Sequence, residues 1–203
     1  MGTHVIDSDF LEAIRAVVGD GNLILDKLVL EYYSTDAFGK WHGPRRNRET
    51  SPVFAVVRPG TTEQVAEIVK LACDQCVPLM PYGGGTGVMG ALNPLDGTVA
   101  VDMKDINVIE NINVEDMTVT VGSGVVLGDL DEALGRHGLM LGHDPYSVPI
   151  ATVGGAISTN GVGYRAAKYG SMGDQVLGLE VVLPTGQIIE TRAVAKTSAG
   201  PSL

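Results

Sequence analysis

The chain has 203 residues, of which 44% are hydrophobic and 19% are charged, and its formal net charge is −10. This composition is typical of a globular protein of one domain or two small lobes, and an acidic chain whose only basic cluster is Arg45–Arg48 is a poor candidate for nucleic-acid binding. No apolar stretch approaches the roughly 18 residues of a transmembrane segment, and the N-terminus MGTHVIDSDF lacks a signal peptide's basic and apolar regions, so we expect a cytoplasmic protein.

Residues 1–50 are predicted to form a helical arm. Apolar residues recur at helical spacing from Phe10 to Val18, and the turn residues Gly19 to Asn22 end this helix. Asp26 to Val29 begins a second short element. Tyr32 to Ser51 is polar, and we expect it to run irregularly over the core.

A β–α–β unit is predicted next. Val53 to Val57 is a continuous apolar run, which is typical of a buried strand. Thr61 and Gln64 form a capping-box pair, and the helix that they begin has one apolar face. Val77 to Met80 is the second strand, and it leads directly into a glycine-rich loop. The apolar face of the helix comprises Val65, Ile68, Val69 and Ala72.

The two cysteines, Cys73 and Cys76, form a C-x-x-C motif at the predicted end of this helix. A thiolate gains nothing from the negative end of a helix dipole. No second Cys or His pair lies nearby in the sequence to complete a tetrahedral zinc site. Because Cys76 continues the apolar stripe of the helix, we expect core packing and no metal site.

The glycine-rich loop, PYGGGTGVMGA, spans Pro81 to Ala91 and has five glycines in eleven residues. Without Cβ atoms, several backbone amides can converge on one anion, and the Thr86 hydroxyl adds a donor. The loop lacks the Gly-Lys-Ser/Thr ending of a Walker motif, which excludes a Walker loop. No helix follows the glycines, so a nicotinamide Rossmann site is disfavoured as well. The loop is therefore predicted to bind a phosphate or pyrophosphate; the alternative is a mobile turn.

Strands are predicted for Thr98 to Asp102, Ile106 to Ile112 and Met117 to Val121. A helix then carries leucines at positions 127, 130 and 134 and ends at His137-Gly138. Near the C-terminus, Asp174 to Leu183 and Gln187 to Glu190 are predicted strands on either side of a Pro-Thr-Gly turn.

A second glycine-rich segment, Gly142 to Gly163, interleaves glycines with small hydroxyl and amide side chains. Gly154 to Thr159 is predicted to begin a helix whose free N–H groups face an anion. The alternative is a helix that packs closely through its small residues.

Four segments together resemble the FAD-binding domain of the vanillyl-alcohol oxidase / p-cresol methylhydroxylase (PCMH-type) superfamily, and most closely its branch of glycolate oxidases and D-lactate dehydrogenases. They read VFAVVRPGTTEQVAEIVKLA, PYGGGTGVMGA, DPYSVPIATVGGAISTNGVGYRAAKYG and QVLGLEVVLPTGQIIET. The resemblance covers roughly residues 51–203 and implies an α+β fold. It implies two α/β lobes, about 51–122 and 123–203, with FAD between them. One departure is Tyr82, which stands where the closest branch commonly has arginine.

The resemblance also implies cofactor-binding residues. The first loop would hold the pyrophosphate, and the second segment would line the rest of the flavin. We expect FAD to be non-covalent, because Pro81 to Ala91 contains no histidine. The candidate residues are Pro81, Tyr82, Gly83, Gly84, Gly85, Thr86, Gly87 and Gly90 in the first loop, and Asp144, Thr152, Gly154, Gly155, Ser158, Thr159, Gly163 and Tyr169 in the second segment.

The expected activity is oxidation of a small-molecule 2-hydroxy acid, of the D-lactate or glycolate type, by hydride transfer to flavin N5. In the resembling family a cap domain supplies most substrate-binding groups, and the ending Lys196 to Leu203 resembles the approach to a segment that closes the FAD domain. We therefore expect lobe two to be truncated and name no catalytic residue. The alternatives are an alkyldihydroxyacetone-phosphate synthase-like flavoenzyme and a non-catalytic FAD-binding module that completes its site with a partner chain.

Overall fold

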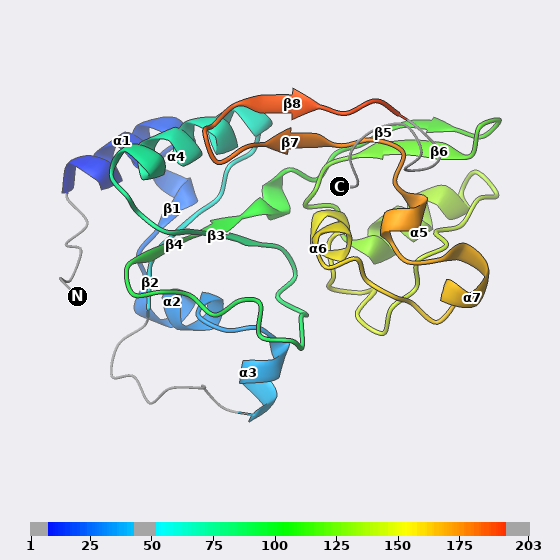
Figure 1. Ribbon diagram of the computed structural model, residues 1–203, viewed down its shortest axis with the longest axis horizontal. Helices are drawn as coiled ribbons and strands as arrows, with labels where there is room; N and C mark the ends of the chain where they lie inside the picture. Colours follow the sequence, from blue (N-terminus) through cyan, green and yellow to red (C-terminus); the bar gives the residue numbers. More distant parts are fainter. Residues whose placement is uncertain (1–7, 43–51, 194–203) are drawn as a thin grey trace. The chain divides into compact units, whose positions relative to one another are not determined.

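The computed structural model describes residues 8–42 and 52–193, and it divides into two compact units (Figure 1). The first unit comprises residues 1–105 and 182–188, and the second comprises residues 106–181 and 189–203. The basic run Arg45–Arg48 and the ending Lys196–Leu203 lie outside the described residues.

The first unit is built on a four-stranded sheet with strand order β1-β2-β4-β3. β2, β4 and β3 are parallel, and β1 pairs antiparallel with β2. The predicted strands Val53–Val57 and Thr98–Asp102 are confirmed at the predicted bounds. The strands are β1 (Leu23–Ile24), β2 (Val53–Val57), β3 (Leu79–Tyr82) and β4 (Thr98–Asp102).

The third strand, β3, differs from the prediction. It begins two residues later than Val77 and continues through Pro81 and Tyr82, which the glycine-rich pattern assigns to the loop. Pro81 pairs with Val101, and Tyr82 with Asp102. Proline is compatible with this position because β3 is the last strand of the sheet, where one side of the strand needs no backbone donor.

Helices cover both faces of this sheet. On one face α1 and α4 bury Phe10, Ile14 and Ile68 against Ala55 and Val57. On the other face the core contains Tyr33, Met80 and Tyr82. The helices of this unit are α1 (Ser8–Val18), α2 (Lys27–Tyr33), α3 (Ala37–His42) and α4 (Thr62–Asp74), with 3-10 turns at Asp20–Asn22 and Met103–Asp105.

The expectation of an irregular segment from Tyr32 onward was wrong for its described part. α2 runs to Tyr33, whose side chain is buried, and α3 follows from Ala37. The pattern was missed because Asp26 and Asp36 cap these short helices with their carboxylates, and short capped helices have little apolar periodicity. Asp26 accepts from the amides of Leu28 and Val29, and Asp36 accepts from the amide of Gly39.

The start of α4 confirms the predicted capping pair of Thr61 and Gln64, but the Gln64 side chain accepts from a different amide than in a standard capping box. Thr61 Oγ1 accepts a hydrogen bond from the Gln64 amide at 3.3 Å. The Gln64 side chain reaches one residue further back than in a standard capping box, because Oε1 accepts from the Gly60 amide at 2.7 Å. The same side chain donates to Val17 O, which joins α4 to α1.

The end of α4 corrects the prediction for the cysteines, because both Cys73 and Cys76 are exposed. The helix stops at Asp74, so Cys76 does not continue its apolar stripe. Cys76 has a left-handed φ of 53° and donates to Cys73 O, while Val77 donates to Ala72 O. This pattern is a Schellman motif with cysteine at the position that glycine usually occupies, and its apolar contact is Val77 on Ala72.

The second unit has the β5–β6 hairpin and three short helices around its own core, while residues 182–188 of the β7–β8 hairpin group with the first unit. Leu127, Leu130 and Leu134 are buried as predicted, and Ile109 and Val121 pack on the same cluster. For this reason residues 106–122 group with the second unit and not with the first lobe, to which the resemblance assigns them. The elements are β5 (Ile109–Asn113), β6 (Thr118–Val121), α5 (Leu127–Gly135), α6 (Val153–Ser158), α7 (Ala166–Tyr169), β7 (Glu180–Val182) and β8 (Ile188–Glu190).

Two predicted strands begin at least three residues later in the structure. β5 begins three residues after Ile106. The predicted strand from Asp174 begins instead as a 3-10 turn at Gly173–Gln175, and only Glu180–Val182 forms the strand β7. The predicted turn is present: Gly186 has a φ of 75° and its amide donates to Leu183 O. Among the residues described, no helix is both long and apolar enough to cross a membrane.

Replacing Cys76 with glycine is expected to raise the free energy of unfolding by about 0.5–1 kcal/mol, because glycine adopts a left-handed φ without the steric cost that a Cβ brings. Urea denaturation measures this change. Cys73→Ser, at the other exposed cysteine, is the matched control and should stay within about 0.5 kcal/mol of wild type. An equal or lower stability of Cys76→Gly would contradict the assignment.

Candidate functional site

The carboxyl ends of three parallel strands lie at one edge of the first unit's sheet. Arg58 follows β2, Tyr82 ends β3, and Asp102 ends β4. The glycine loop leaves the sheet at this edge, directly after Tyr82. Ligands in open sheets of this kind bind outside the carboxyl ends of the strands, so this edge is the candidate site.

The glycine loop has the geometry of an anion cradle. Gly85 and Gly90 have φ of 63° and 73°, a region that favours glycine. No described residue accepts a hydrogen bond from the amides of residues 84–90. Gly83, Gly84, Gly85, Thr86 and Gly87 are half-buried. Unpaired amides on a glycine-rich turn suit the negatively charged diphosphate of a nucleotide cofactor.

Tyr82 lies beneath this loop, with its side chain 1% exposed. A Cβ on Gly85 would collide with the Tyr82 hydroxyl, so this glycine allows the loop to rest on the tyrosine. The ring packs on Tyr33 with 4.5 Å between centroids. Burial raises the pKa of Tyr82 well above its usual range, so the hydroxyl stays protonated. The side chain therefore supports the loop from below, while Pro81 is exposed on the strand before it.

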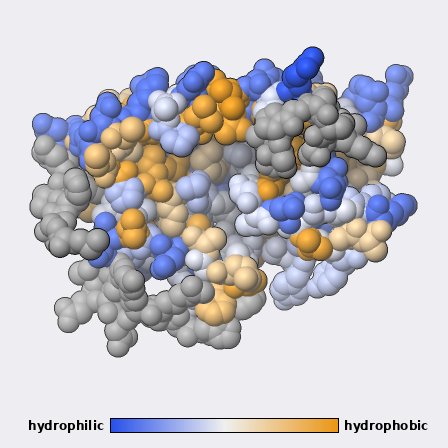
Figure 2. Space-filling model, viewed as in Figure 1, coloured by the Kyte–Doolittle hydropathy of each residue, from blue (hydrophilic) through white to orange (hydrophobic). Residues whose placement is uncertain are grey.

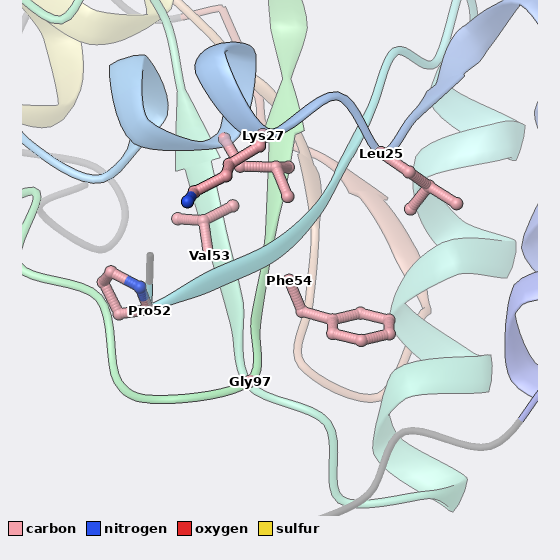
Figure 3. Close-up of a pocket in the computed structure, with 7 residues that line it drawn as sticks. Leu25, Lys27, Pro52, Val53, Phe54 and Gly97 are labelled. Atoms are coloured by element: carbon pink, nitrogen blue, oxygen red, sulfur yellow. The ribbon is translucent and has the colours of Figure 1, made fainter. Parts of the chain in front are cut away.

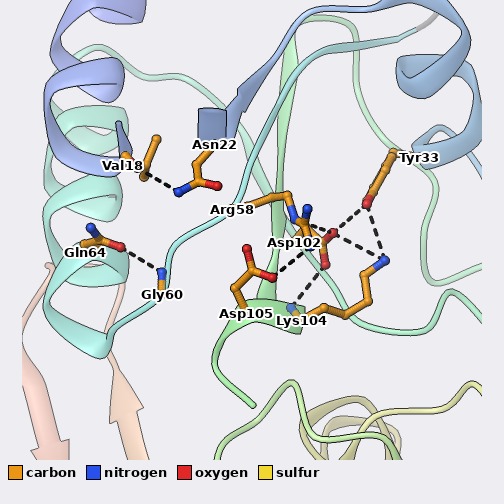
Figure 4. Close-up of polar contacts among 9 residues, drawn as sticks. All are labelled: Val18, Asn22, Tyr33, Arg58, Gly60, Gln64, Asp102, Lys104 and Asp105. Carbon is orange, nitrogen blue, oxygen red and sulfur yellow. Dashed lines mark hydrogen bonds and ion pairs between the residues drawn. The ribbon is translucent and has the colours of Figure 1, made fainter. Parts of the chain in front are cut away.

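A buried carboxylate organises the same edge (Figure 4). Asp102 is 1% exposed, and its Oδ2 accepts a hydrogen bond from the Tyr33 hydroxyl at 2.5 Å. Lys104 Nζ lies 3.3 Å and Arg58 Nε 3.6 Å from the same oxygen. Arg58 also pairs with Asp105 at 2.8 Å. Burial, followed by the hydrogen bond to Asp102, raises the pKa of Tyr33 far above its usual range.

Sequence reasoning missed the part that α3 plays at this site. The Phe38 amide donates to Gly87 O at 3.3 Å, so α3 contacts the loop through its backbone. Asp36 is 2% exposed and faces Gly87, and Lys40 Nζ lies 3.4 Å from the Tyr82 hydroxyl. The signal that could have found this helix is Asp36, a good N-cap residue directly before it.

In the second unit the N-terminus of α6 is closed to anions, which corrects the prediction of free N–H groups. The Val153 amide donates to Val125 O, and the Gly154 amide donates to Ser123 O, each at 2.8 Å. The Gly155 amide donates to Thr152 Oγ1 at 3.3 Å. A Cβ on Gly154 would lie 2.8 Å from Ser123 Cβ. The small residues therefore serve close packing, the alternative left open by the sequence.

The remaining candidates of the second segment have distinct environments. Asp144 binds Arg165 twice, through the Arg165 amide at 2.7 Å and Nε at 3.1 Å. Gly163 is required there, because a Cβ would lie 2.6 Å from the Asp144 amide nitrogen. Ser158 and Thr159 are exposed at the end of α6, where the Thr159 hydroxyl donates to Gly155 O.

Tyr169 and His143 pack against glycines of the same unit. A Cβ on Gly142 would lie 2.9 Å from Tyr169 Cγ, and one on Gly161 would lie 3.1 Å from His143 Nε2. His143 is 2% exposed, and no described residue hydrogen-bonds to its Nδ1. Burial lowers the pKa of His143, against a smaller opposing effect of Asp144. The imidazole is therefore neutral at pH 7.

Apolar side chains also reach the surface, and Figure 2 shows them as orange areas among blue hydrophilic ones. In the glycine loop Met89 is 86% exposed, and in the second unit Tyr146 is 84% and Tyr164 is 79% exposed. A hollow of about 410 Å³ lies on the first unit (Figure 3). Its described lining contains no candidate flavin-site residue and comprises Leu25, Lys27, Leu30, Pro52, Val53, Phe54 and Gly97.

No metal site accompanies these features within residues 8–42 and 52–193, where no three His, Cys, Asp or Glu side chains form a group able to hold a metal ion. The candidate residues thus fall into two sets, each described within its own unit. The first set forms the amide cradle on the sheet edge, and the second surrounds α6 and the turn at Gly163.

Comparisons with known proteins agree on one family. The sequence profile described as FAD binding domain matches residues 53–192. The chain is 39% identical to the glycolate oxidase subunit GlcD of Bacillus subtilis over 98% of this chain and 41% of that protein. It is 40% identical to a D-lactate dehydrogenase of Anaerostipes hadrus over 73% of this chain and 31% of that one.

Alkyldihydroxyacetonephosphate synthases are similar too. The Trypanosoma brucei brucei protein is 33% identical over 92% of this chain and 31% of its own length. A solved alkyldihydroxyacetonephosphate synthase superposes with a TM-score of 0.83 at 27% identity, over 98% of this chain and 39% of that one. p-Cresol methylhydroxylase superposes with a TM-score of 0.76 at 25% identity, over 96% and 39%. The chain spans about two fifths of the length of the first curated relatives.

Tyr33→Phe is expected to lower the free energy of unfolding by about 1.5–3 kcal/mol, since it removes a hydrogen bond to a buried charged group. Chemical denaturation of the purified variant measures the loss. Tyr146→Phe removes the same hydroxyl from an 84% exposed side chain and should change stability by no more than about 0.5 kcal/mol. Equal effects of the two substitutions would contradict the role given to the Tyr33–Asp102 bond.

Proposed function

The chain belongs to the FAD binding domain family, and from that premise we propose that its glycine loop, Pro81 to Gly90, binds the diphosphate of FAD in a flavin-dependent oxidoreductase that oxidises a 2-hydroxy acid. FAD is the cofactor of this family. The observation that carries the assignment of the loop is the set of amides at residues 84–90 that donate to no described residue, at the carboxyl edge of three parallel strands.

The residues of this chain hold and orient the cofactor. Bound FAD supplies the two-electron redox chemistry, and the protein supplies position and electrostatics. Backbone donors of the loop stabilise the diphosphate. Tyr82 supports the loop by packing under Gly85. Asp144, Gly155, Ser158, Thr159, Gly163 and Tyr169 are proposed for the rest of the flavin. Of these, Gly155, Ser158 and Thr159 are exposed and so accessible.

The hydroxy-acid substrate is proposed from the relatives. GlcD and the D-lactate dehydrogenases share 36–40% of aligned residues with this chain. The second candidate is chemistry of the alkyldihydroxyacetonephosphate synthase type, which the TM-score of 0.83 favours. We name no catalytic base, because the buried histidine of the second unit, His143, is 2% exposed and packed against Gly161.

Gly84→Val is expected to abolish FAD binding while keeping the far-UV circular dichroism spectrum. The added side chain blocks an amide cradle whose charge-assisted hydrogen bonds contribute about 1.5–3 kcal/mol each. Titration of deflavinated protein with FAD, followed by flavin fluorescence, measures the dissociation constant. Preparing the deflavinated protein also tests non-covalent binding. Acid is expected to release all flavin from the wild type, and flavin retained on the precipitate would contradict non-covalent binding.

Gly97→Val is the matched control for this experiment. Gly97 has a φ of 82° with no atom near its Cβ position, so valine there strains the backbone outside the loop. We expect lower stability and an unchanged FAD dissociation constant. If Gly84→Val bound FAD as the wild type does, the assignment of the loop would be wrong.

In the complete FAD-loaded protein that contains this chain, anaerobic D-lactate or glycolate is expected to bleach the flavin absorption bands. L-Lactate is the control for the stereochemistry of the substrate. Bound FAD that no 2-hydroxy acid bleaches, together with ether-lipid-type transferase activity, would replace the hydroxy-acid assignment by the second candidate.

A further inference from the structure

Lys40 places a positive charge beside the glycine loop. Its ammonium lies 3.4 Å from the Tyr82 hydroxyl and 3.6 Å from the centre of the Tyr32 ring. The Tyr82 hydroxyl in turn lies directly under Gly85. The ammonium is therefore separated from the loop backbone by a single hydroxyl group.

The helix that carries Lys40 is fixed to the same loop. The Asp36 carboxylate accepts a hydrogen bond from the Gly39 amide at 3.1 Å. The Asp36 backbone carbonyl accepts one from the Lys40 amide, also at 3.1 Å. The Phe38 amide donates to Gly87 O at 3.3 Å. Figure 1 shows the loop that follows β3 running next to α3. These bonds hold the backbone of Lys40 in a defined place relative to the amide cradle.

Lys40 is also the cation of this edge that no described carboxylate neutralises. Arg58 pairs with Asp102 and Asp105, and Lys104 pairs with Asp102. The aromatic ring and the hydroxyl that hold the Lys40 ammonium position it without cancelling its charge.

One buried carboxylate lies next to the loop. The Asp36 Oδ2 atom is buried, takes no hydrogen bond from a described residue, and lies 3.9 Å from the Cβ position of Gly87. The whole chain carries a formal charge of −10. Amide dipoles carry only partial positive charge, so a full cation near this loop would offset the Asp36 carboxylate and stabilise a dianionic diphosphate.

We propose that the Lys40 ammonium binds the diphosphate of FAD at the glycine loop. The inference rests on the proposed function, because it assumes that the loop is the diphosphate site. A diphosphate oxygen is a stronger acceptor for the ammonium than the tyrosine hydroxyl at 3.4 Å. Lys40 thereby adds a side-chain charge to a site that is otherwise made of backbone donors.

The test is titration of deflavinated full chain with FAD at low and high salt. Lys40→Gln is expected to raise the FAD dissociation constant about tenfold and to weaken its dependence on salt, because the screened charge is gone. Lys40→Arg keeps the charge and should stay near wild type. Lys27→Gln, which removes a lysine that lines the hollow in Figure 3, is the control and should leave FAD binding unchanged.

Competition experiments separate diphosphate binding from a structural effect. ADP should lose affinity for Lys40→Gln by a factor similar to that of FAD, whereas adenosine, which has no phosphate, should not. If wild type binds FAD and Gly84→Val does not, but Lys40→Gln binds FAD and ADP as wild type does, the role of Lys40 is overturned and the loop assignment stands. If the wild type does not bind FAD, the proposed function fails and the inference fails with it.

Discussion

The buried carboxylate of Asp102 is the interaction on which the first unit's functional edge depends. A buried charge is stable only when donors and cations surround it, and here the Tyr33 hydroxyl and the cations of Arg58 and Lys104 do so. These partners come from α2, from the exit of β2 and from the turn after β4. One carboxylate therefore joins three separate segments at the edge where the glycine loop leaves β3.

The glycine loop depends on this arrangement through Tyr82. The Tyr33 ring, held by Asp102, packs on the Tyr82 ring, and the Tyr82 hydroxyl lies under Gly85. The order of support runs from a charge, through two aromatic rings, to a backbone turn whose amides at residues 84–90 donate to no described residue. A polar network therefore lies below the glycine-rich turn and supports it through the two rings.

The sequence predicted those parts whose signal is local. VFAVV is a continuous apolar run, the leucines of α5 recur at helical spacing, and the loop is marked by its glycines. Other parts depend on contacts that local patterns do not encode. Tyr33 and Asp36 were predicted to lie in a polar, irregular segment. Their burial depends on contacts with Asp102 and Gly87, respectively, which are distant in the sequence. Cys76 was predicted to continue the apolar stripe of α4, because no glycine marks the end of the helix at Asp74. The sequence predicted free amides at the start of α6 because two of their acceptors, the carbonyls of Ser123 and Val125, are also distant in the sequence.

Pro81 has a consequence beyond the entry to the loop. It lies in β3, the last strand of the sheet, directly before the residue that supports the glycines. The unpaired side of a terminal strand is a template on which another polypeptide can add a strand. A residue without an N–H group breaks the row of donors that such an addition needs. The proline that stiffens the approach to the glycine loop therefore also discourages edge-to-edge aggregation at this strand.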